Sequence, residues 1–528
     1  MSTTDARDRT TTRTVASIIG GKTLEDAPGG RSSSVNPART DEKVADVLLG
    51  DAGTFVEASR AARKAQKEWA AVPAPIRAQV IKKIGRIIEN NKEALSRLVT
   101  REIGKPYAES LGEVQEIIDT CDFFTGEGRR LYGQTVPSEM PDKQLFTFRV
   151  PVGVAAIITA GNFPVAVPSW YIIPALTCGN TVVWKPAEYS PAISDAFARL
   201  FIAGGLPAGV LNVVQAEGKA TFEGLERALD EGLVDKVGFT GSSEVGQEIG
   251  ALCGRHLQNP CLELGGKNPL VVMPDADLDL AVEGALFSGF GTAGQRCTSL
   301  GTVILHESVH DEFLSRLTKA VEEAPIGDPT QDVLYGPMIS EKFHERFLGW
   351  LDLIEAHHSV HGSTGIGRIM KDNPREGFVG EPDVGIFCHP TIVDGVTAED
   401  EIYRTETFGP LIGIAKFSDF DEAVKLSNGH GYGLSAAIYT RDATNALRFR
   451  ERNTAGMLSV NNSTSGAEAH LPFGGNGKSG NGSRLSGIWV IDQFTRWQSM
   501  NWDYAGRLQK AQMDIAETPA DLDFRLPE

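Results

Sequence analysis

Residues 153–186, GVAAIITAGNFPVAVPSWYIIPALTCGNTVVWKP, hold two runs rich in apolar and β-branched residues on either side of a segment of helix length. The runs cover residues 153–160 and 180–186, and both are typical of buried strands. Another segment of helix length, AISDAFARLFIAGG, follows the second run. Strands that alternate with helices indicate βαβ units, in which the strands lie parallel in one sheet. The sequence therefore predicts an α/β fold.

The same region must be tested as a membrane helix, because residues 151–184 carry no charged side chain and are long enough to cross a bilayer. Prolines at positions 151, 164, 168 and 174 would interrupt any single helix. Each interruption would leave backbone groups unpaired in lipid. We therefore predict a buried core of strand, loop and helix.

The alternation continues along the rest of the chain. Residues 55–69 and 76–103 have the apolar spacing of amphipathic helices. In LVDKVGFTGSSEVGQEIGALC (233–253), a strand ends at Phe239 and a helix starts near Ser243. A second set follows Gly266, with strands at PLVVM and GTVILH and helices over 277–289 and 308–323. At 528 residues the chain is long enough for two or three structural units, and we expect a second α/β domain.

Composition narrows the class of partner. The formal net charge of −18 disfavours binding to nucleic acid or to an anionic membrane surface, so a small molecule is the expected partner. The six cysteines show no CxxC spacing, which favours reduced thiols and a cytoplasmic location. The polar N-terminus lacks the apolar segment of a signal peptide and is expected to form an arm.

One literal motif match points to another class of enzyme. HESVH (306–310) matches the HExxH motif, in which two histidines on one helical face bind zinc. Here a strand runs into His306, and Ser308 with Asp311 resembles the capped start of a helix. His306 would then precede the helix, so we predict no metal site and keep a zinc hydrolase as a remote alternative.

A candidate nucleophile lies in GTAGQRCTS (291–299). Backbone N–H groups of the Gly- and Thr-rich turn, together with the positive charge of Arg296, would lower the pKa of the Cys297 thiol and favour thiolate. Free cysteines are also among the most buried residues. From these residues alone, a nucleophile and a buried structural thiol are equally supported.

Three other polar positions have both a chemical and a structural interpretation. Glu263 is flanked by leucines, which would raise its pKa and suit a general base, although the polar face of a strand explains it better in isolation. Asn162 in GNFP suits an oxyanion contact or an ordinary turn before proline. Lys185 and Glu188 in WKPAE suit ribose hydroxyls or a solvated surface pair.

Taken together, these motifs resemble a known family. The chain contains, in order, GNFP, WKPAE, FTGSSEVG, LELGGKNP, GTAGQRC, ETFGP and PFGG. From about Val44 to Tyr504 it resembles the NAD(P)-dependent aldehyde dehydrogenase superfamily. The resemblance implies an α/β fold with a Rossmann-type NAD-binding domain, an α/β catalytic domain and a small β oligomerisation extension. The implied reaction is oxidation of an aldehyde to a carboxylic acid through a thioester.

The resemblance also assigns roles. Cys297 is implied as nucleophile, Asn162 and the Cys297 N–H as oxyanion donors, and Glu263 as the base that activates water. The implied cofactor contacts are Lys185 and Glu188 at the adenine ribose, Ser242 at the pyrophosphate, and Glu406 and Phe408 at the nicotinamide ribose and ring. Since Glu188 would repel a 2′-phosphate, NAD is expected over NADP.

Two positions depart from the family pattern. Many relatives have Lys where this chain has Tyr171, and Glu where it has Arg484, and these two side chains are thought to relay protons from the base. The Lys common in the PFGGxK motif is replaced by Gly477, with Lys478 displaced by one position. These departures leave the proton route of this chain open.

The aldehyde is less well defined. GEVQEIIDTCDFF, NFPVAV, GTAGQRCT and HESVHDEF resemble the antiquitin subgroup most, which oxidises α-aminoadipic semialdehyde. This implies that Glu116 and Arg296 hold the amino and carboxylate groups of the substrate, and that Gly466 and Ala467 add backbone N–H donors. Alternatively, Glu116 and Arg296 pair with each other in a broad-specificity enzyme for aliphatic or aromatic aldehydes.

The expected organisation follows from the resemblance. Strands at 144–150 and 494–504 are similar to the strands through which the family forms a homodimer or homotetramer. The expected parts are an N-terminal arm (1–43), an NAD-binding domain (44–138 and 152–266), a catalytic domain (267–484), oligomerisation strands (139–151 and 485–505) and a C-terminal tail (506–528).

Overall fold

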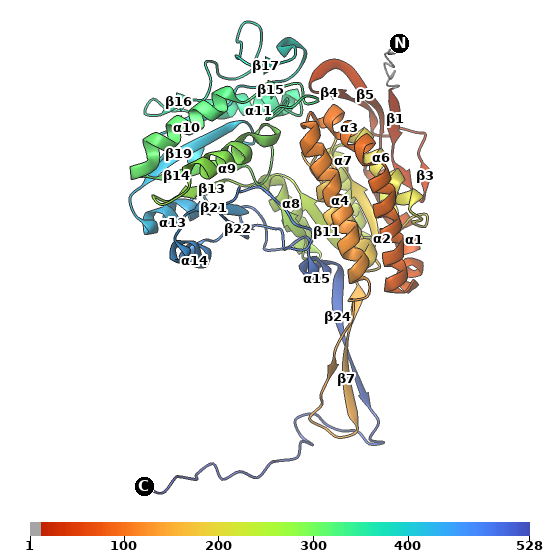
Figure 1. Ribbon diagram of the computed structural model, residues 1–528. Coiled ribbons are helices and arrows are strands. Elements are labelled where there is room, and N and C mark those ends of the chain that lie inside the picture. Colours follow the sequence, from red (N-terminus) through yellow and green to blue (C-terminus); the bar gives the residue numbers. More distant parts are fainter. Residues whose placement is uncertain (1–11) are drawn as a thin grey trace, which may run out of the picture.

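Two seven-stranded sheets, each covered by helices, organise the chain, and a long β-ribbon projects from them (Figure 1). The computed structural model describes residues 12–528. The α/β prediction is confirmed, because the central strands of both sheets are parallel and are connected through helices. The chain enters the second sheet only after finishing the helices of the first.

The first sheet has the order β12-β11-β8-β9-β10-β2-β3. Its strands are β2 (Ile18–Ile19), β3 (Lys22–Thr23), β8 (Val154–Ile158), β9 (Thr181–Lys185), β10 (Leu211–Val213), β11 (Lys236–Thr240) and β12 (Cys261–Glu263). Its helices are α1 (Ala52–Ala71), α2 (Ala74–Asn90), α3 (Lys92–Ile103), α4 (Tyr107–Glu127), α5 (Ala166–Thr177), α6 (Pro191–Ala203), α7 (Gly218–Asp230) and α8 (Ser243–Arg255).

The opening stretch forms the centre of this sheet. Strands β8 and β9 pair in parallel, and every residue of both is buried. Helix α5 between them is also buried at every position, so it has no solvent-exposed face and lies entirely within the core. Within residues 12–528 the structure contains no helix that is both long and apolar enough to cross a membrane.

The second sheet has the order β16-β18-β19-β14-β13-β21-β22. Its strands are β13 (Asn268–Val272), β14 (Leu300–His306), β16 (Ser359–His361), β18 (Thr391–Asp394), β19 (Leu411–Phe417), β21 (Ser435–Tyr439) and β22 (Met457–Val460). Its helices are α9 (Leu278–Phe290), α10 (His310–Glu323), α11 (Glu341–Leu351), α12 (Glu401–Arg404), α13 (Phe420–Asn428) and α14 (Ala443–Arg452). Short pairs join β15 (Ile326–Gly327) to β17 (Phe378–Val379) and β20 (Tyr432–Gly433) to β23 (Asn476–Gly477).

The ribbon consists of β6 (Thr135–Val136), β7 (Lys143–Pro151) and β24 (Thr495–Asp503). Strands β7 and β24 pair antiparallel along their whole length, and β24 is reached through the short helix α15 (Ile491–Phe494). Figure 1 shows the ribbon extending away from both sheets, with the C-terminal segment beyond it. The two segments predicted to form strands at the edge therefore pair with each other.

The structure differs from three local expectations. The N-terminal arm was expected over residues 1–43, of which 1–11 lie outside the described residues. Residues 13–36 instead contribute β1 (Arg13–Ala16), β4 (Gly30–Asn36) and two strands of the first sheet, and β1 and β4 flank β5 (Arg39–Leu49). The helix expected over 76–103 is divided at Asn91. The helix expected from Ser308 starts at His310, because residues 307–309 form a 3-10 turn capped by the His306 side chain.

Candidate active site

Three adjoining cavities run between the two sheets. The Lys185 cavity, about 660 Å³, is lined by Lys185, Glu188, Thr240 and Ser242 among others. The central cavity, about 210 Å³, shares Thr240 and Ser242 with it and contains Asn162, Cys297, Glu406 and Phe408. The Glu116 cavity, about 310 Å³, shares Cys297 with the central cavity and contains Glu116, Arg296, Gly466 and Ala467. All predicted site residues except Glu263 therefore line one continuous path, with Cys297 at the junction.

Backbone strain positions the Cys297 loop. Thr292 and Ala293, in the 3-10 turn Gly291–Gly294 before the cysteine, both have positive φ angles, which are rare for residues with a side chain. Glu109 of α4 holds this turn, since its carboxylate accepts bonds from the Thr292 hydroxyl and from the Thr292 N–H, the latter at 3.2 Å. The Cys297 loop of the second sheet is thus tied to a helix that covers the first sheet.

The same carboxylate of Glu109 forms an ion pair with Arg296. The Arg296 guanidinium also donates to the Thr292 hydroxyl at 3.2 Å and lies over the Phe287 ring. The expectation that Arg296 would stabilise a Cys297 thiolate is therefore wrong in this structure, because its charge is directed to Glu109. The alternative pairing of Arg296 with Glu116 is absent from the described residues as well.

The Cys297 thiol is protonated in this environment. Burial, and then the nearby carboxylates of Glu263 and Glu406, raise its pKa to about 12. The backbone N–H groups of Thr298 and Cys297 oppose this shift and lower the pKa. The predicted N–H effect is therefore present, but two acids and desolvation outweigh it.

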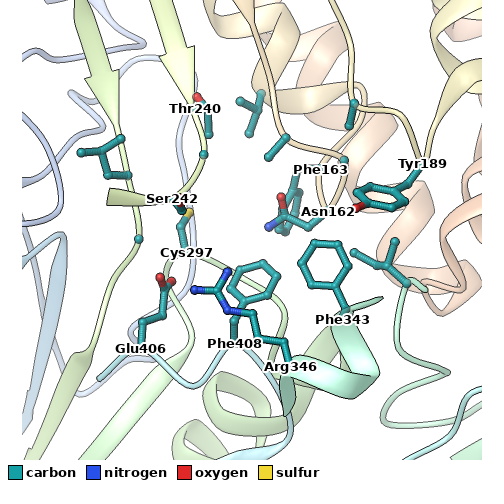
Figure 2. Close-up of a pocket in the computed structure, with 18 of the residues that line it drawn as sticks. Asn162, Phe163, Tyr189, Thr240, Ser242, Cys297, Phe343, Arg346, Glu406 and Phe408 are labelled. Atoms are coloured by element: carbon teal, nitrogen blue, oxygen red, sulfur yellow. The ribbon is translucent and has the colours of Figure 1, made fainter. Parts of the chain in front are cut away.

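Two asparagines fix the peptide groups beside Cys297. The Asn162 amide donates to the carbonyl of Gln295, two residues before Cys297, at 2.9 Å, and Asn162 and Cys297 line the same cavity (Figure 2). The Asn268 amide donates to the carbonyls of Cys297 (2.8 Å) and Ser299 (2.7 Å). With the Cys297 carbonyl held by Asn268, the Thr298 N–H in the same peptide group keeps a fixed direction.

Glu263 ends β12 behind the central cavity and is 3% exposed. Neither of its carboxylate oxygens has a hydrogen-bond partner among the described residues. Burial therefore raises its pKa well above the usual range, and only Arg484 and the Gly475 N–H oppose the shift. A buried carboxyl with a raised pKa holds a proton more readily than an exposed one, a property that suits a general base.

The Lys185 cavity contains an ion pair between a lysine and a glutamate, and it also contains the N-terminus of a helix. Lys185 ends β9 and contacts Glu188 at 3.3 Å, while burial lowers the pKa of the lysine. Ser242 caps helix α8, and its hydroxyl accepts from the Val245 N–H at 3.4 Å. Free N–H groups at a helix start suit a phosphate, and the paired Lys and Glu suit sugar hydroxyls.

At the other end of the central cavity, Glu406 accepts a bond from the Gly266 N–H at 3.0 Å. A Cβ on Gly265 would lie 1.9 Å from the Glu406 carboxylate, so this close approach requires glycine. Phe408 has a φ of 29° and its ring lies 5.7 Å from that of Phe343. Burial raises the pKa of Glu406 to about 7.

In the Glu116 cavity, one acid is left without a countercharge. Glu113 pairs with Lys105 and Glu109 with Arg296, whereas the buried Glu116 Oε1 has no partner among residues 12–528. Burial and then repulsion from Glu113 raise the pKa of Glu116 to about 8. The N–H groups of Gly466 and Ala467 make no hydrogen bond within that same range.

Sequence reasoning missed several residues of this site. Arg346 on α11 extends toward Glu406 in Figure 2, and Glu109 and Asn268 hold the Cys297 loop. Asn268 stands in the quoted motif LELGGKNP, so it was open to detection. Arg346 and Glu109 lie in ordinary amphipathic helices, where no sequence signal separates them from surface charges.

Two groups of histidines are candidate metal sites. His306 ends β14 and bonds Ser308, whereas His310 starts α10 and bonds Asp311 and Asp394, so the HESVH histidines face different partners. Elsewhere in the described chain, His357, His358 and Asp400 lie close together. His358 Nδ1 accepts from the Glu355 N–H at 2.9 Å, which leaves Nε2 protonated toward Asp400 and unable to bind a metal.

Comparison with known proteins identifies a family match and similar enzymes. A family model described as the aldehyde dehydrogenase family matches residues 25–500. An alpha-ketoglutarate semialdehyde dehydrogenase of Haloferax volcanii is 37% identical over 87% of this chain and 92% of its own length. The alpha-aminoadipic semialdehyde dehydrogenase of Bos taurus is 36% identical over 92% of this chain and 88% of its own.

Solved structures agree in fold. The NAD-dependent aldehyde dehydrogenase from Sinorhizobium meliloti superposes with a TM-score of 0.88 at 31% identity, covering 96% of this chain and 99% of that one. Betaine aldehyde dehydrogenase from Staphylococcus aureus, solved in complex with NAD+, gives a TM-score of 0.87 at 28% identity, covering 93% and 95%.

Proposed function

The chain belongs to the aldehyde dehydrogenase family, and from this premise we propose that it oxidises an amino-acid semialdehyde, such as α-aminoadipic semialdehyde, with NAD. The observation that carries the substrate assignment is the unpaired Glu116 in a cavity that also contains Cys297. Bovine and other relatives at about this level of identity are named as semialdehyde dehydrogenases.

The residues of the cavities fit NAD. Lys185 and Glu188 would hold the adenine ribose, the N-terminus of α8 at Ser242 the pyrophosphate, and Glu406 the nicotinamide ribose. The absence of a side chain at Gly265 lets the Glu406 carboxylate approach the backbone there. When bound, NAD supplies the acceptor for the hydride that leaves the aldehyde carbon.

The chain's own residues perform the other steps. Cys297 releases its proton to water in the cavity and its thiolate sulfur attacks the aldehyde carbon, while the Asn162 amide and the Cys297 N–H stabilise the oxyanion. Loss of hydride from that carbon leaves a thioester. Glu263 then takes a proton from water, and the oxygen of the resulting hydroxide bonds to the thioester carbon. The carbon–sulfur bond breaks, which releases the acid and the Cys297 thiolate.

The charge distribution of the Glu116 cavity supports a zwitterionic end on the substrate. An ammonium group beside Glu116 would restore the ionised carboxylate, which is costly to bury alone. The free N–H groups of Gly466 and Ala467 suit the neighbouring carboxylate. Arg296 contributes less than the sequence implied, since Glu109 already balances its charge.

A second candidate is oxidation of neutral aliphatic or aromatic aldehydes. The lining of the Glu116 cavity favours it, because most of its side chains besides the charged groups are apolar or aromatic: Phe163, Val167, Trp170, Phe287 and Phe473. With Glu116 protonated and Arg296 paired, the cavity would carry no net charge. The affinity for neutral substrates would then depend only on the apolar contact area and on how well the substrate fits the shape of the cavity.

The experiment that tests the proposal compares kcat/KM for α-aminoadipic semialdehyde, hexanal and benzaldehyde by NADH formation. We expect the semialdehyde to be preferred, and Glu116→Gln to lower its kcat/KM at least about tenfold while changing that of hexanal less than about threefold. Equal losses for both, or a parent that prefers hexanal, would favour the neutral-aldehyde enzyme. Loss of activity in Cys297→Ala is required in either case.

A further inference from the structure

The route by which the base Glu263 loses its proton starts from the two departures at Tyr171 and Arg484. The Arg484 guanidinium donates to the carbonyls of Gly475 (3.2 Å) and Ser483 (2.9 Å) and to Asn476 Oδ1 (2.9 Å). An arginine does not give up its proton in a protein, so it cannot accept one from Glu263. A proton on Glu263 therefore has to leave by another side.

Thr240 lies on that other side. Strands β11 and β12 pair in parallel with Thr240 directly opposite Glu263, which places the two side chains on the same face of the sheet. Thr240 lines both the central and the Lys185 cavities, whereas Glu263 lines neither. In Figure 2 the Thr240 hydroxyl lies at the edge of the central cavity. Thr240 is thus a neighbour of Glu263 in the sheet and also a lining residue of the open path.

Tyr171 completes the group. Its ring is fully buried and packs against Gly238, where a Cβ would lie 2.7 Å from the ring. Its hydroxyl lies 2.9 Å from the Thr240 hydroxyl and 3.2 Å from the Phe239 carbonyl. Burial, and then the Glu263 carboxylate, hold the pKa of Tyr171 far above its usual value, so the phenol stays neutral and acts through its hydrogen bonds.

We propose that the proton taken up by Glu263 during thioester hydrolysis leaves through the Thr240 hydroxyl into the cofactor path, and that Tyr171 orients that hydroxyl. The inference rests on the proposed function, because it concerns the hydrolysis step of that reaction. It assigns Thr240 as the relay residue and Tyr171 as a positioning residue.

The hydrogen balance closes in both protonation states. In the structure neither Glu263 oxygen has a hydrogen-bond partner among the described residues, so the relay requires the carboxylate to turn toward Thr240. Once ionised there, it accepts from the Thr240 hydroxyl, which accepts from Tyr171. With Glu263 protonated, its O–H donates to Thr240, the Thr240 hydrogen passes to water in the cavity, and Tyr171 turns to the Phe239 carbonyl. Thr240 gains one proton and loses one, and no hydroxyl is left without a partner.

The test separates the two halves of the reaction in Thr240→Val and Tyr171→Phe. Enzyme and NAD are mixed rapidly with α-aminoadipic semialdehyde and, separately, with propanal, and both the NADH burst and the decay of the thioester are followed. We expect the burst rate to stay within about threefold of the parent. Thioester hydrolysis should slow at least about tenfold in Thr240→Val and about threefold to tenfold in Tyr171→Phe. The burst should then approach one NADH per active site.

Two controls exclude a general structural effect. Thr240→Ser retains the hydroxyl and should restore hydrolysis to within about threefold. Tyr335→Phe removes an equally buried phenol, whose hydroxyl donates to the Cys388 carbonyl at 2.9 Å in the other core, and should change neither step. Normal hydrolysis in Thr240→Val, or a loss confined to the burst, would overturn the relay alone. A parent that forms no NADH would overturn the proposed function and the relay with it.

Discussion

Arg296 is paired with Glu109 and not with Glu116. This buried pair connects the residue next to Cys297 to helix α4, and the same carboxylate fixes Thr292 in its strained conformation. Arg296 is therefore part of the support of the Cys297 loop, while Glu116 lines its cavity without an ion-pair partner among the described residues. A variant that lacks Arg296 should therefore change the stability of the fold more than the choice of substrate.

The first prediction concerns this pair. Arg296→Met leaves Glu109 buried without a countercharge, a change that costs about 3 kcal/mol in comparable cases, so the melting temperature should fall by several degrees. The double variant Arg296→Met/Glu109→Gln should recover much of the loss. The exposed pair of Arg316 with Asp279 provides the control, since Arg316→Met should leave the melting temperature unchanged. Equal melting temperatures for parent and Arg296→Met would contradict the structural role.

A second prediction follows from the Cys297 environment. Because burial and two carboxylates raise its pKa to about 12, the thiolate fraction should rise about tenfold per pH unit between pH 7 and pH 9. Iodoacetamide labelling of Cys297, followed by mass spectrometry without NAD, should increase in that proportion. Glu263→Gln removes the larger of the two carboxylate effects and should speed labelling at every pH at which Glu263 is ionised in the parent. A plateau near pH 7 in the parent would disprove the raised pKa.

The sequence predicted the elements well where a local pattern controls them, and missed what depends on distant partners. Strands β8 and β9 were predicted from short apolar runs that contain β-branched residues, and both strands are buried on both faces of the sheet. The break at Asn91 was missed because the apolar spacing continues through it. Cys297, Asn162 and Glu263 were identified only by their order in a motif set. The pairing of Arg296 was not predictable, since Glu109 and Glu116 lie on one helix and only packing determines which of them the guanidinium meets.

The choice between NAD and NADP should depend on Glu188. Its carboxylate lies 3.3 Å from Lys185 in the cavity expected to hold the adenine ribose, where it would repel a 2′-phosphate. Glu188→Gln should therefore raise kcat/KM for NADP about tenfold and lower that for NAD. Glu226→Gln, on the same helix-rich face but paired with Arg255, is a matched control and should change neither value. An unchanged NADP activity in Glu188→Gln would remove Glu188 from the cofactor site.

Arg346 provides a further test of the cofactor path. It forms no ion pair within residues 12–528 and lines the central cavity with Glu406, where its charge partly opposes the burial that raises the Glu406 pKa. A guanidinium in that place suits the pyrophosphate of NAD. Arg346→Ala should raise KM for NAD about tenfold with kcat within about twofold, and Arg346→Lys should lie between. Arg450→Ala on α14 should have no effect, and a fall in kcat alone for Arg346→Ala would exclude the cofactor contact.

The last prediction concerns assembly through the ribbon of β7 and β24. Trp497 and Trp502 on β24 are 54% and 57% exposed, and Phe148 on β7 is 42% exposed, so both faces of the strand pair that projects into solvent carry apolar side chains. We expect a second copy of the chain to cover it, so that light scattering gives a homodimer or homotetramer. Trp497→Lys/Trp502→Lys should shift the mass toward the monomer, because each lysine would be buried in the contact. Leu447→Lys, at a 60% exposed position on α14, should leave the mass unchanged. A monomeric parent would contradict the prediction directly.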